Sequence, residues 1–278
     1  MLYDINEIKS AISYDRYSDR IDVIKLNDEE NDYIIDILEK AVKVRRYSKI
    51  SAKISYRNRE FFLKKEYIIE ARIPNLYRGN EEGLFLAKYF SVERETVRDK
   101  EIINKVIHEA AKNKNKNKYC RLLLREDLMY RLVREKELDE LVDFYRKNVK
   151  SRLLSVIDYK YIEDFINNDT VYGVICKKEK IIAAVACEVD RENLNAEMTN
   201  FAGDENFRGK GLARYLAISM EEEMKKIGIK TLYSVVRAKS FDANILFSKI
   251  GFKFSGTLIN NTNISGRIES MNVWYKEI

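Results

Sequence analysis

The chain has 278 residues, of which 45% are hydrophobic and 11% aromatic, enough for one large core or two smaller ones, and we predict two domains. Its 51 basic and 45 acidic residues nearly cancel, so the net charge of +6 gives only weak, nonspecific attraction to nucleic acid. The sequence has neither an apolar run that could cross a membrane nor a leader pattern, and we expect a cytoplasmic protein.

The residue types needed for several kinds of site are scarce. The three cysteines, Cys120, Cys176 and Cys187, lack both the even number of a disulfide framework and the spacing of a metal site, and we expect them to be buried. The single histidine, His108, is too little for a histidine metal cluster or a Ser/His/Asp triad. We therefore predict no metal, and catalysis by carboxylates, tyrosines or backbone groups.

Residues 1–111 are predicted to form a smaller N-terminal α/β domain. Here the segments 49–55 (KISAKIS), 61–65, 67–73 and 83–90 read as strand, helix, strand and strand, an order that recurs at the C-terminus. The repeat indicates a degenerate copy of part of the second domain, although a coincidental order of elements is an open alternative.

A lysine and asparagine run at 112–118 (KNKNKNK) follows, and its like charges offer nothing to a core. We interpret residues 112–126 as a linker between the N-terminal domain and a domain at 127–278. Nucleic-acid binding by this run is a weaker alternative, because no aromatic residues interleave the lysines.

The C-terminal domain alternates between strand and helix patterns. In chain order we predict a strand at 129–134, helices at 138–147 and 161–167, a hairpin of strands at 171–176 and 180–189, a strand at 196–202, a helix at 211–227, a strand at 231–236, a helix at 241–250, and strands at 253–259 and 268–275. This is an α/β domain with a mixed sheet.

The junction between the strand at 196–202 and the next helix is suited to a phosphate. Gly209 and Gly211 permit a tight turn, while the first N–H groups of the helix, with Arg208 and Lys210, attract an anion. Gly211 follows Lys210 where a Walker loop needs Ser or Thr, and a dinucleotide loop needs a third glycine. What remains is R-x-x-G-x-A, although a basic turn that only caps the helix is the simpler alternative.

This motif resembles the coenzyme A diphosphate loop of the GNAT acetyltransferase superfamily. Together with 196–202, 260–276, 67–74 and 86–90, it is similar to the β-lysine N6-acetyltransferase family within that superfamily. The resemblance implies a GNAT fold in the C-terminal domain and a degenerate GNAT-like N-terminal domain. It also implies transfer of acetyl from acetyl-CoA to the terminal amine of β-lysine, giving N6-acetyl-β-lysine, a compatible solute used in osmoadaptation.

The resemblance also assigns the cofactor contacts. Backbone N–H groups from Arg208 to Ala213, through Gly209, Lys210, Gly211 and Leu212, would hold the diphosphate, and the strand end at Phe201 and Ala202 would pair with the amide arm. Asn244 is expected to point to the cofactor, with Phe247 one turn later. Many relatives carry at the Phe247 position a tyrosine that protonates the leaving thiolate, and this hydroxyl is absent here.

An amine acceptor needs a base that removes its proton before attack. Glu197 is our candidate, with Thr199 and Phe201 expected on the same strand face. A salt bridge to a lysine on a neighbouring strand is an equal alternative for Glu197, and Glu188 is the reserve candidate.

For the rest of a β-lysine acceptor, Arg267 or Arg237 would bind the carboxylate, and Asn261, Asn263 or Glu269 would bind the second amine. Arg267 and Glu269 could instead form a surface ion pair. An acceptor other than β-lysine, and a coenzyme A-binding protein without turnover, stay open as alternatives.

Overall fold

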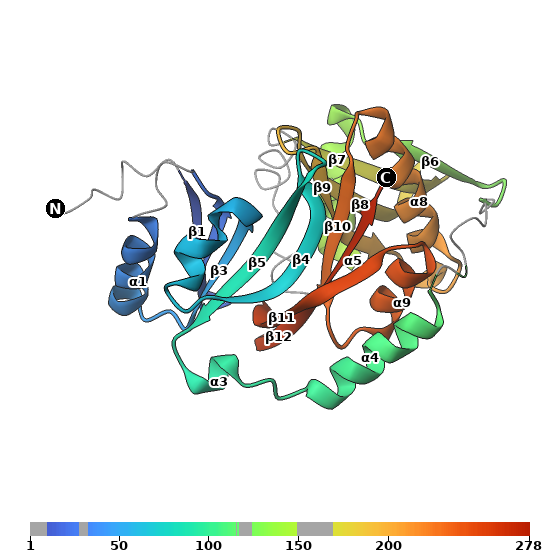
Figure 1. Ribbon diagram of the computed structural model, residues 1–278. Helices are drawn as coiled ribbons and strands as arrows, with labels where there is room; N and C mark the ends of the chain where they lie inside the picture. The colour runs from blue at the N-terminus through green and yellow to red at the C-terminus, as the bar shows by residue number, and fades with distance from the viewer. Residues whose placement is uncertain (1–9, 28–32, 115, 117–123, 149–168) are drawn as a thin grey trace.

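The computed structural model describes residues 10–27, 33–114, 116, 124–148 and 169–278. They form two sheets that stand side by side, each with helices packed on it (Figure 1). The helix predicted at 161–167, Cys120 and most of the predicted linker lie outside the described residues. Cys176 and Cys187 are buried, as predicted.

The N-terminal half forms a five-stranded sheet. Its elements are β1 (Ala11–Asp15), β2 (Arg20–Lys25), α1 (Ile34–Arg45), β3 (Lys49–Ser55), α2 (Arg59–Leu63), β4 (Ile68–Tyr77) and β5 (Glu81–Tyr89), in the sheet order β1-β2-β3-β5-β4. Alternate residues of β3, among them Ile50, Ala52 and Ile54, pack with α1 and α2 in one core. The opposite residues of β3 face away from this core.

Two helices, α3 (Val92–Glu95) and α4 (Lys100–Lys112), lead out of this sheet. Helix α4 runs along α9 (Phe241–Lys249) of the C-terminal half (Figure 1), and Ser248 of α9 donates a hydrogen bond to the carbonyl of Ala110 at 2.6 Å. Ala110 is fully buried in the C-terminal core. Helix α4, which the sequence prediction includes in the N-terminal domain at residues 1–111, therefore packs on the C-terminal half.

The C-terminal half forms a seven-stranded mixed sheet of order β11-β12-β10-β9-β8-β7-β6. The elements are β6 (Leu128–Leu132), α5 (Leu138–Asn148), β7 (Thr170–Lys177), β8 (Lys180–Asp190), β9 (Asn195–Gly203), α8 (Leu212–Lys226), β10 (Thr231–Arg237), α9, β11 (Lys253–Ile264) and β12 (Arg267–Glu277). Helices α8 and α9 pack on one face and α5 on the other, which explains the continuous apolar run of β8. The predicted elements within the described residues are confirmed.

The two sheets share one connectivity. In the N-terminal half, β2 and β3 are parallel neighbours joined through α1, and β5 then lies between β3 and β4. In the C-terminal half, β9 and β10 are parallel neighbours joined through α8, and β12 lies between β10 and β11. The N-terminal half therefore repeats the second part of the C-terminal fold, and the interpretation of the sequence repeat as a degenerate copy is supported.

The halves meet through an apolar cluster and a close backbone contact. Tyr233, Leu258 and Val273 of the C-terminal sheet pack against Ala71 and other residues of β4. At Gly256 of β11, an added Cβ would lie 2.8 Å from the Cα atom of Ala71, so only glycine permits this approach. No helix within the described residues is long and apolar enough to cross a membrane.

Candidate active site

The predicted diphosphate loop lies between β9 and α8. Gly209 and Gly211 have φ angles of 76° and 78°, in the left-handed region that favours glycine, and a Cβ at either position would meet no atom within 4 Å. Gly211 is the N-cap of α8 and provides no capping side chain, so the first N–H groups of the helix have no side-chain cap. Arg208 and Lys210 are exposed beside them. This arrangement fits an anionic diphosphate.

Strands β9 and β10 separate beyond Glu197. Within the described residues, their parallel ladder consists of Thr231 with Asn195, Leu232 with Ala196, and Tyr233 with Glu197, and it ends there. One residue further along β10, the Ser234 hydroxyl donates a hydrogen bond to the carbonyl of Met198 at 2.7 Å. The opening leaves backbone groups of β9 after Met198 free of a ladder partner in β10, where an amide-bearing substrate arm could pair with them.

A bulge interrupts β9 at this opening. Asn200 has a φ of 52°, the register with β8 shifts at this point, and the Tyr145 hydroxyl donates to the Asn200 carbonyl at 2.7 Å. The extra residue reverses the faces that follow, so Phe201 packs against Phe247 in the α8 and α9 core. The prediction that Phe201 shares a face with Glu197 is therefore wrong. Thr199, before the bulge, stays on the face of Glu197.

Glu197 lies in a group of interacting polar side chains. It stands directly opposite Glu188 in the antiparallel β8–β9 ladder, and both are half-buried. Burial raises the pKa of Glu197. Lys53 and a hydrogen bond with Tyr233 lower this pKa and offset part of the rise. Burial and the Glu197 carboxylate raise the pKa of Glu188 to about 8. Carboxylates with raised pKa values can take up a proton near neutral pH, as a general base must.

Asn244 and Phe247 do not have the predicted roles. The Asn244 side chain is fully buried, donates to the carbonyls of Arg237 and Ser240 at 3.0 and 2.7 Å, and accepts from Asn272 and Trp274 at 2.9 and 2.8 Å. These four contacts use all of its hydrogen-bonding capacity. Phe247 is 1% exposed and packs on Phe201 and Phe252. The prediction that these two side chains contact a cofactor is wrong, because both belong to the core.

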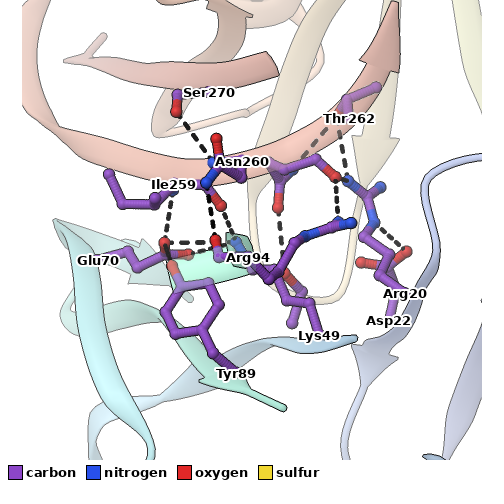
Figure 2. A network of polar contacts seen from close by, with 12 residues as sticks. Arg20, Asp22, Lys49, Glu70, Tyr89, Arg94, Ile259, Asn260, Thr262 and Ser270 are labelled. Carbon is purple, nitrogen blue, oxygen red and sulfur yellow. Dashed lines mark hydrogen bonds and ion pairs between the residues drawn. The ribbon is translucent and has the colours of Figure 1, made fainter. Parts of the chain in front are cut away.

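The asparagine-rich segment is part of a long hairpin and not a loop between shorter strands. Strand β11 extends to Ile264, and the turn is Ser265 and Gly266, with φ angles of 53° and 89°. The Asn260 amide donates to the carbonyl of Arg94 at 2.8 Å (Figure 2) and to the carbonyl of Thr96, also at 2.8 Å.

The Asn261 side chain accepts from Ser51 at 3.2 Å, and Asn263 donates to the carbonyl of Tyr17 at 2.8 Å. The structure does not support Asn261 and Asn263 as substrate ligands, because both bind the N-terminal half.

Beneath this hairpin lies a buried ion pair. Lys49 and Glu70, whose side chains are 0% and 2% exposed, are 3.0 Å apart, and Glu70 also accepts from Tyr89 and from the backbone N–H of Ile259 (Figure 2). Lys49 donates to the Ile259 carbonyl at 2.8 Å, and its burial lowers its pKa to about 8. Since each charge has several partners, the network fixes the hairpin on the N-terminal sheet.

The remaining predicted substrate residues divide into two groups. Arg237, at the end of β10, pairs with buried Glu269 through two hydrogen bonds of 3.0 and 2.9 Å, and Lys239 lies 3.8 Å from the same carboxylate. Glu269 is therefore neutralised by these cations, which does not support it as an amine ligand, and its ion-pair partner is Arg237 instead of the expected Arg267. Arg267 is exposed beside the hairpin turn.

Two residues of the site were missed from the sequence. Lys53 of β3 donates to the Tyr233 hydroxyl at 3.0 Å, and Tyr233 lies in β10 next to Glu197. The alternation of KISAKIS predicts that Lys49, Ser51 and Lys53 share a face, but it does not predict that this face is covered by the C-terminal half.

The comparison with protein families finds the Acetyltransferase (GNAT) family over residues 135–252. This range includes the diphosphate loop, both strands of the opening and helix α9.

Three curated proteins are similar to the chain. A "Beta-lysine N(6)-acetyltransferase" of Methanococcus maripaludis is 32% identical over 99% of this chain and 98% of its own length. The "N-acetyltransferase YodP" of Bacillus subtilis is 25% identical over 98% and 97%, respectively. A "Beta-lysine N(6)-acetyltransferase" of Methanosarcina mazei is 32% identical over 41% and 42%. The similarity to the first two covers both halves of the fold.

Proposed function

The chain belongs to the GNAT family of acetyltransferases and acts as an acetyl-CoA-dependent N-acetyltransferase, and we propose that its acceptor is the terminal amine of β-lysine. The product would be N6-acetyl-β-lysine, serving as a compatible solute. The observation that carries the proposal is the similarity to a β-lysine N6-acetyltransferase along nearly the whole chain, because it includes the N-terminal half that covers the site.

The diphosphate of acetyl-CoA would bind at the N-terminus of α8. The N–H groups of Leu212 and Ala213 would donate to it, with Arg208 and Lys210 beside them. The amide arm would lie in the opening between β9 and β10, pairing with backbone groups near Ala202. In this arrangement the acetyl group would lie close to Glu197, and a backbone N–H at the bulge would stabilise negative charge on its carbonyl oxygen.

Glu197 would act as the general base. The ammonium of the acceptor gives one proton to the Glu197 carboxylate, so an N–H bond breaks and an O–H bond forms. The nitrogen lone pair then attacks the thioester carbonyl, a C–N bond forms, and the C–S bond breaks. The electron pair of that bond leaves on sulfur, and the thiolate takes up the second proton, which the nitrogen loses as the neutral amide forms. Phe247 cannot supply this proton, since it has no hydroxyl.

The charges around Glu197 suit an acceptor with two amines. The facing pair Glu188 and Glu197 shares negative charge that attracts a cationic amine, and because burial raises the pKa of both, either takes up a proton more readily than an exposed carboxylate does. Of the two arginines predicted for the acceptor carboxylate, exposed Arg267 is the proposed ligand, because Arg237 already pairs with Glu269.

The test is release of the coenzyme A thiol with purified protein, acetyl-CoA and a panel of amines. We expect turnover with β-lysine, weaker turnover with α-lysine and little with spermidine, with mass spectrometry placing the acetyl group on N6. A higher kcat/KM for spermidine or a protein N-terminus would establish a different acceptor. Binding of acetyl-CoA without thiol release from any amine would indicate a coenzyme A-binding protein without turnover.

A further inference from the structure

Strand β3 of the N-terminal half presents one row of polar side chains to the C-terminal half. Lys49 binds Glu70 and the Ile259 carbonyl, Ser51 donates to Asn261, and Lys53 donates to Tyr233. Lys49 and Ser51 contact the hairpin described above and explain how the halves are joined. Lys53 contacts β10 at the residue paired with Glu197, so its position relates to the reaction.

The position of Lys53 is well defined. Its Nζ atom lies 3.0 Å from the Tyr233 hydroxyl oxygen and 5.3 Å from the centre of the Tyr233 ring, and the Tyr77 hydroxyl donates to its backbone carbonyl at 3.2 Å. Tyr233 is 4% exposed, and its ring packs edge-on against Phe85. Both partners are thereby held by surrounding structure, and little side-chain freedom is left to lose when a substrate binds.

The direction of the hydrogen bonds links Lys53 to Glu197. An ammonium can only donate, so the Tyr233 oxygen accepts from Lys53 and its own proton is directed elsewhere. A hydrogen bond between Tyr233 and Glu197 lowers the pKa of Glu197. The hydrogen bonds therefore run from Lys53 to Tyr233 and from Tyr233 to Glu197, and the first hydrogen bond strengthens the second.

Several charged or titratable groups act on the Glu197 carboxylate, and they come from different strands. Glu188 of β8 repels it, and burial opposes its charge, whereas the cations favour the charge. The groups on the elements packed around it are Arg20 of β2, Lys53 of β3, Tyr77 of β4, Glu188 of β8 and Tyr233 of β10. Lys53 is the cation that acts on both carboxylates.

We propose that Lys53 is a positioning residue for acetyl transfer: acting through Tyr233, it orients Glu197 and keeps it ready to accept a proton. The N-terminal half thus completes the active site of the C-terminal half. This inference rests on the proposed role of Glu197 as the base.

The test compares the pH dependence of kcat/KM for the full-length wild type and for Lys53→Met, with a saturating acetyl-CoA concentration. Methionine keeps most of the length of the side chain and removes the charge. We expect the rising limb of the profile to move up by about one pH unit, so that kcat/KM at a pH on that limb falls about tenfold and recovers at higher pH. The acceptor amine ionises identically in both reactions, so a difference between the profiles reports on the enzyme.

Two further variants separate positioning from stability. Lys53→Arg restores the cation and should return at least half of the shift. Lys88→Met is the matched control, because Lys88 is also a partly buried lysine of the N-terminal sheet but pairs with Glu39, away from the site. It should leave the profile unchanged. If Lys53→Met does not fold, Tyr233→Phe keeps the ring, removes the link, and should give the same upward shift.

The outcomes distinguish this inference from the proposed function. If Lys53→Met leaves the rising limb unmoved while Glu197→Gln abolishes turnover, Lys53 has no positioning role, although Glu197 remains the base. The same holds if Lys53→Met lowers kcat/KM equally at every pH. If Glu197→Gln retains full activity, the proposed base itself is wrong.

Discussion

Replacing Asn244 by alanine distinguishes a structural from a cofactor-binding role at this position. The truncation strands two buried donors, the Trp274 indole N–H and the Asn272 amide, which are 3% and 0% exposed. The carbonyls of Arg237 and Ser240 keep backbone partners, in Ser240 and Asn244 respectively, and so lose less.

Each stranded donor costs about 1–3 kcal/mol, and alanine returns a few tenths through its helix propensity. We therefore expect the free energy of unfolding to fall by about 2–5 kcal/mol.

The assay is urea unfolding for stability and calorimetry for acetyl-CoA binding to the folded protein. Asn80→Ala is the control, because Asn80 is exposed in the β4–β5 turn and its loss should change stability by less than about 0.5 kcal/mol. The folded Asn244→Ala protein should bind acetyl-CoA with a Kd within about threefold of the wild type. A loss of less than about 1 kcal/mol, or a Kd raised more than tenfold, would refute the structural role argued here.

Three further predictions concern the site. Gly211→Glu should raise the acetyl-CoA Kd by at least about 100-fold in calorimetry, because it places a negative charge in the open space at the start of α8. The control Gly228→Glu changes a glycine that also has a left-handed φ, at the other end of α8, and should leave the Kd unchanged. Equal Kd values for the two variants would reject the diphosphate site. Glu197→Gln should lower kcat/KM by about 10²- to 10⁴-fold without changing the acetyl-CoA Kd, and retained turnover would remove Glu197 as the base. Glu188→Gln leaves one carboxylate where two repelling carboxylates titrate as a pair, so the higher apparent pKa of the pair is lost; the rising limb of the pH profile should therefore move to lower pH, and an upward shift would contradict the carboxylate pair.

Sequence reasoning predicted helices and strands well where the hydrophobic pattern is caused only by burial inside one half of the protein. The apolar run of β8 and the spacing of α9 reflect burial inside a single half, and local periodicity records such burial. The tight turn before α8 was also predictable, because its glycines and basic residues are adjacent in the chain, while its binding of a diphosphate stays a prediction.

Features that depend on long-range packing could not be predicted. The asparagines of β11 resemble a loop, and their partners, such as Ser51 and Tyr17, lie more than 200 residues away. The bulge at Asn200 adds one residue to a strand and reverses the face of Phe201, which strict alternation cannot foresee. Asn244 was assigned by resemblance, whereas two of its four contacts, those with Asn272 and Trp274, arise from the packing of α9 on β12.

The apolar cluster between the sheets has a practical consequence for dissecting the enzyme. Tyr233, Leu258, Met271 and Val273 are shielded from water by β4, and a fragment starting after α4 would bare them together on one face. Such an exposed apolar surface promotes aggregation, so the C-terminal half should be insoluble when it is expressed without the N-terminal half. Expressing the two halves from separate plasmids should restore the solubility of the C-terminal half only when both halves are made in the same cell.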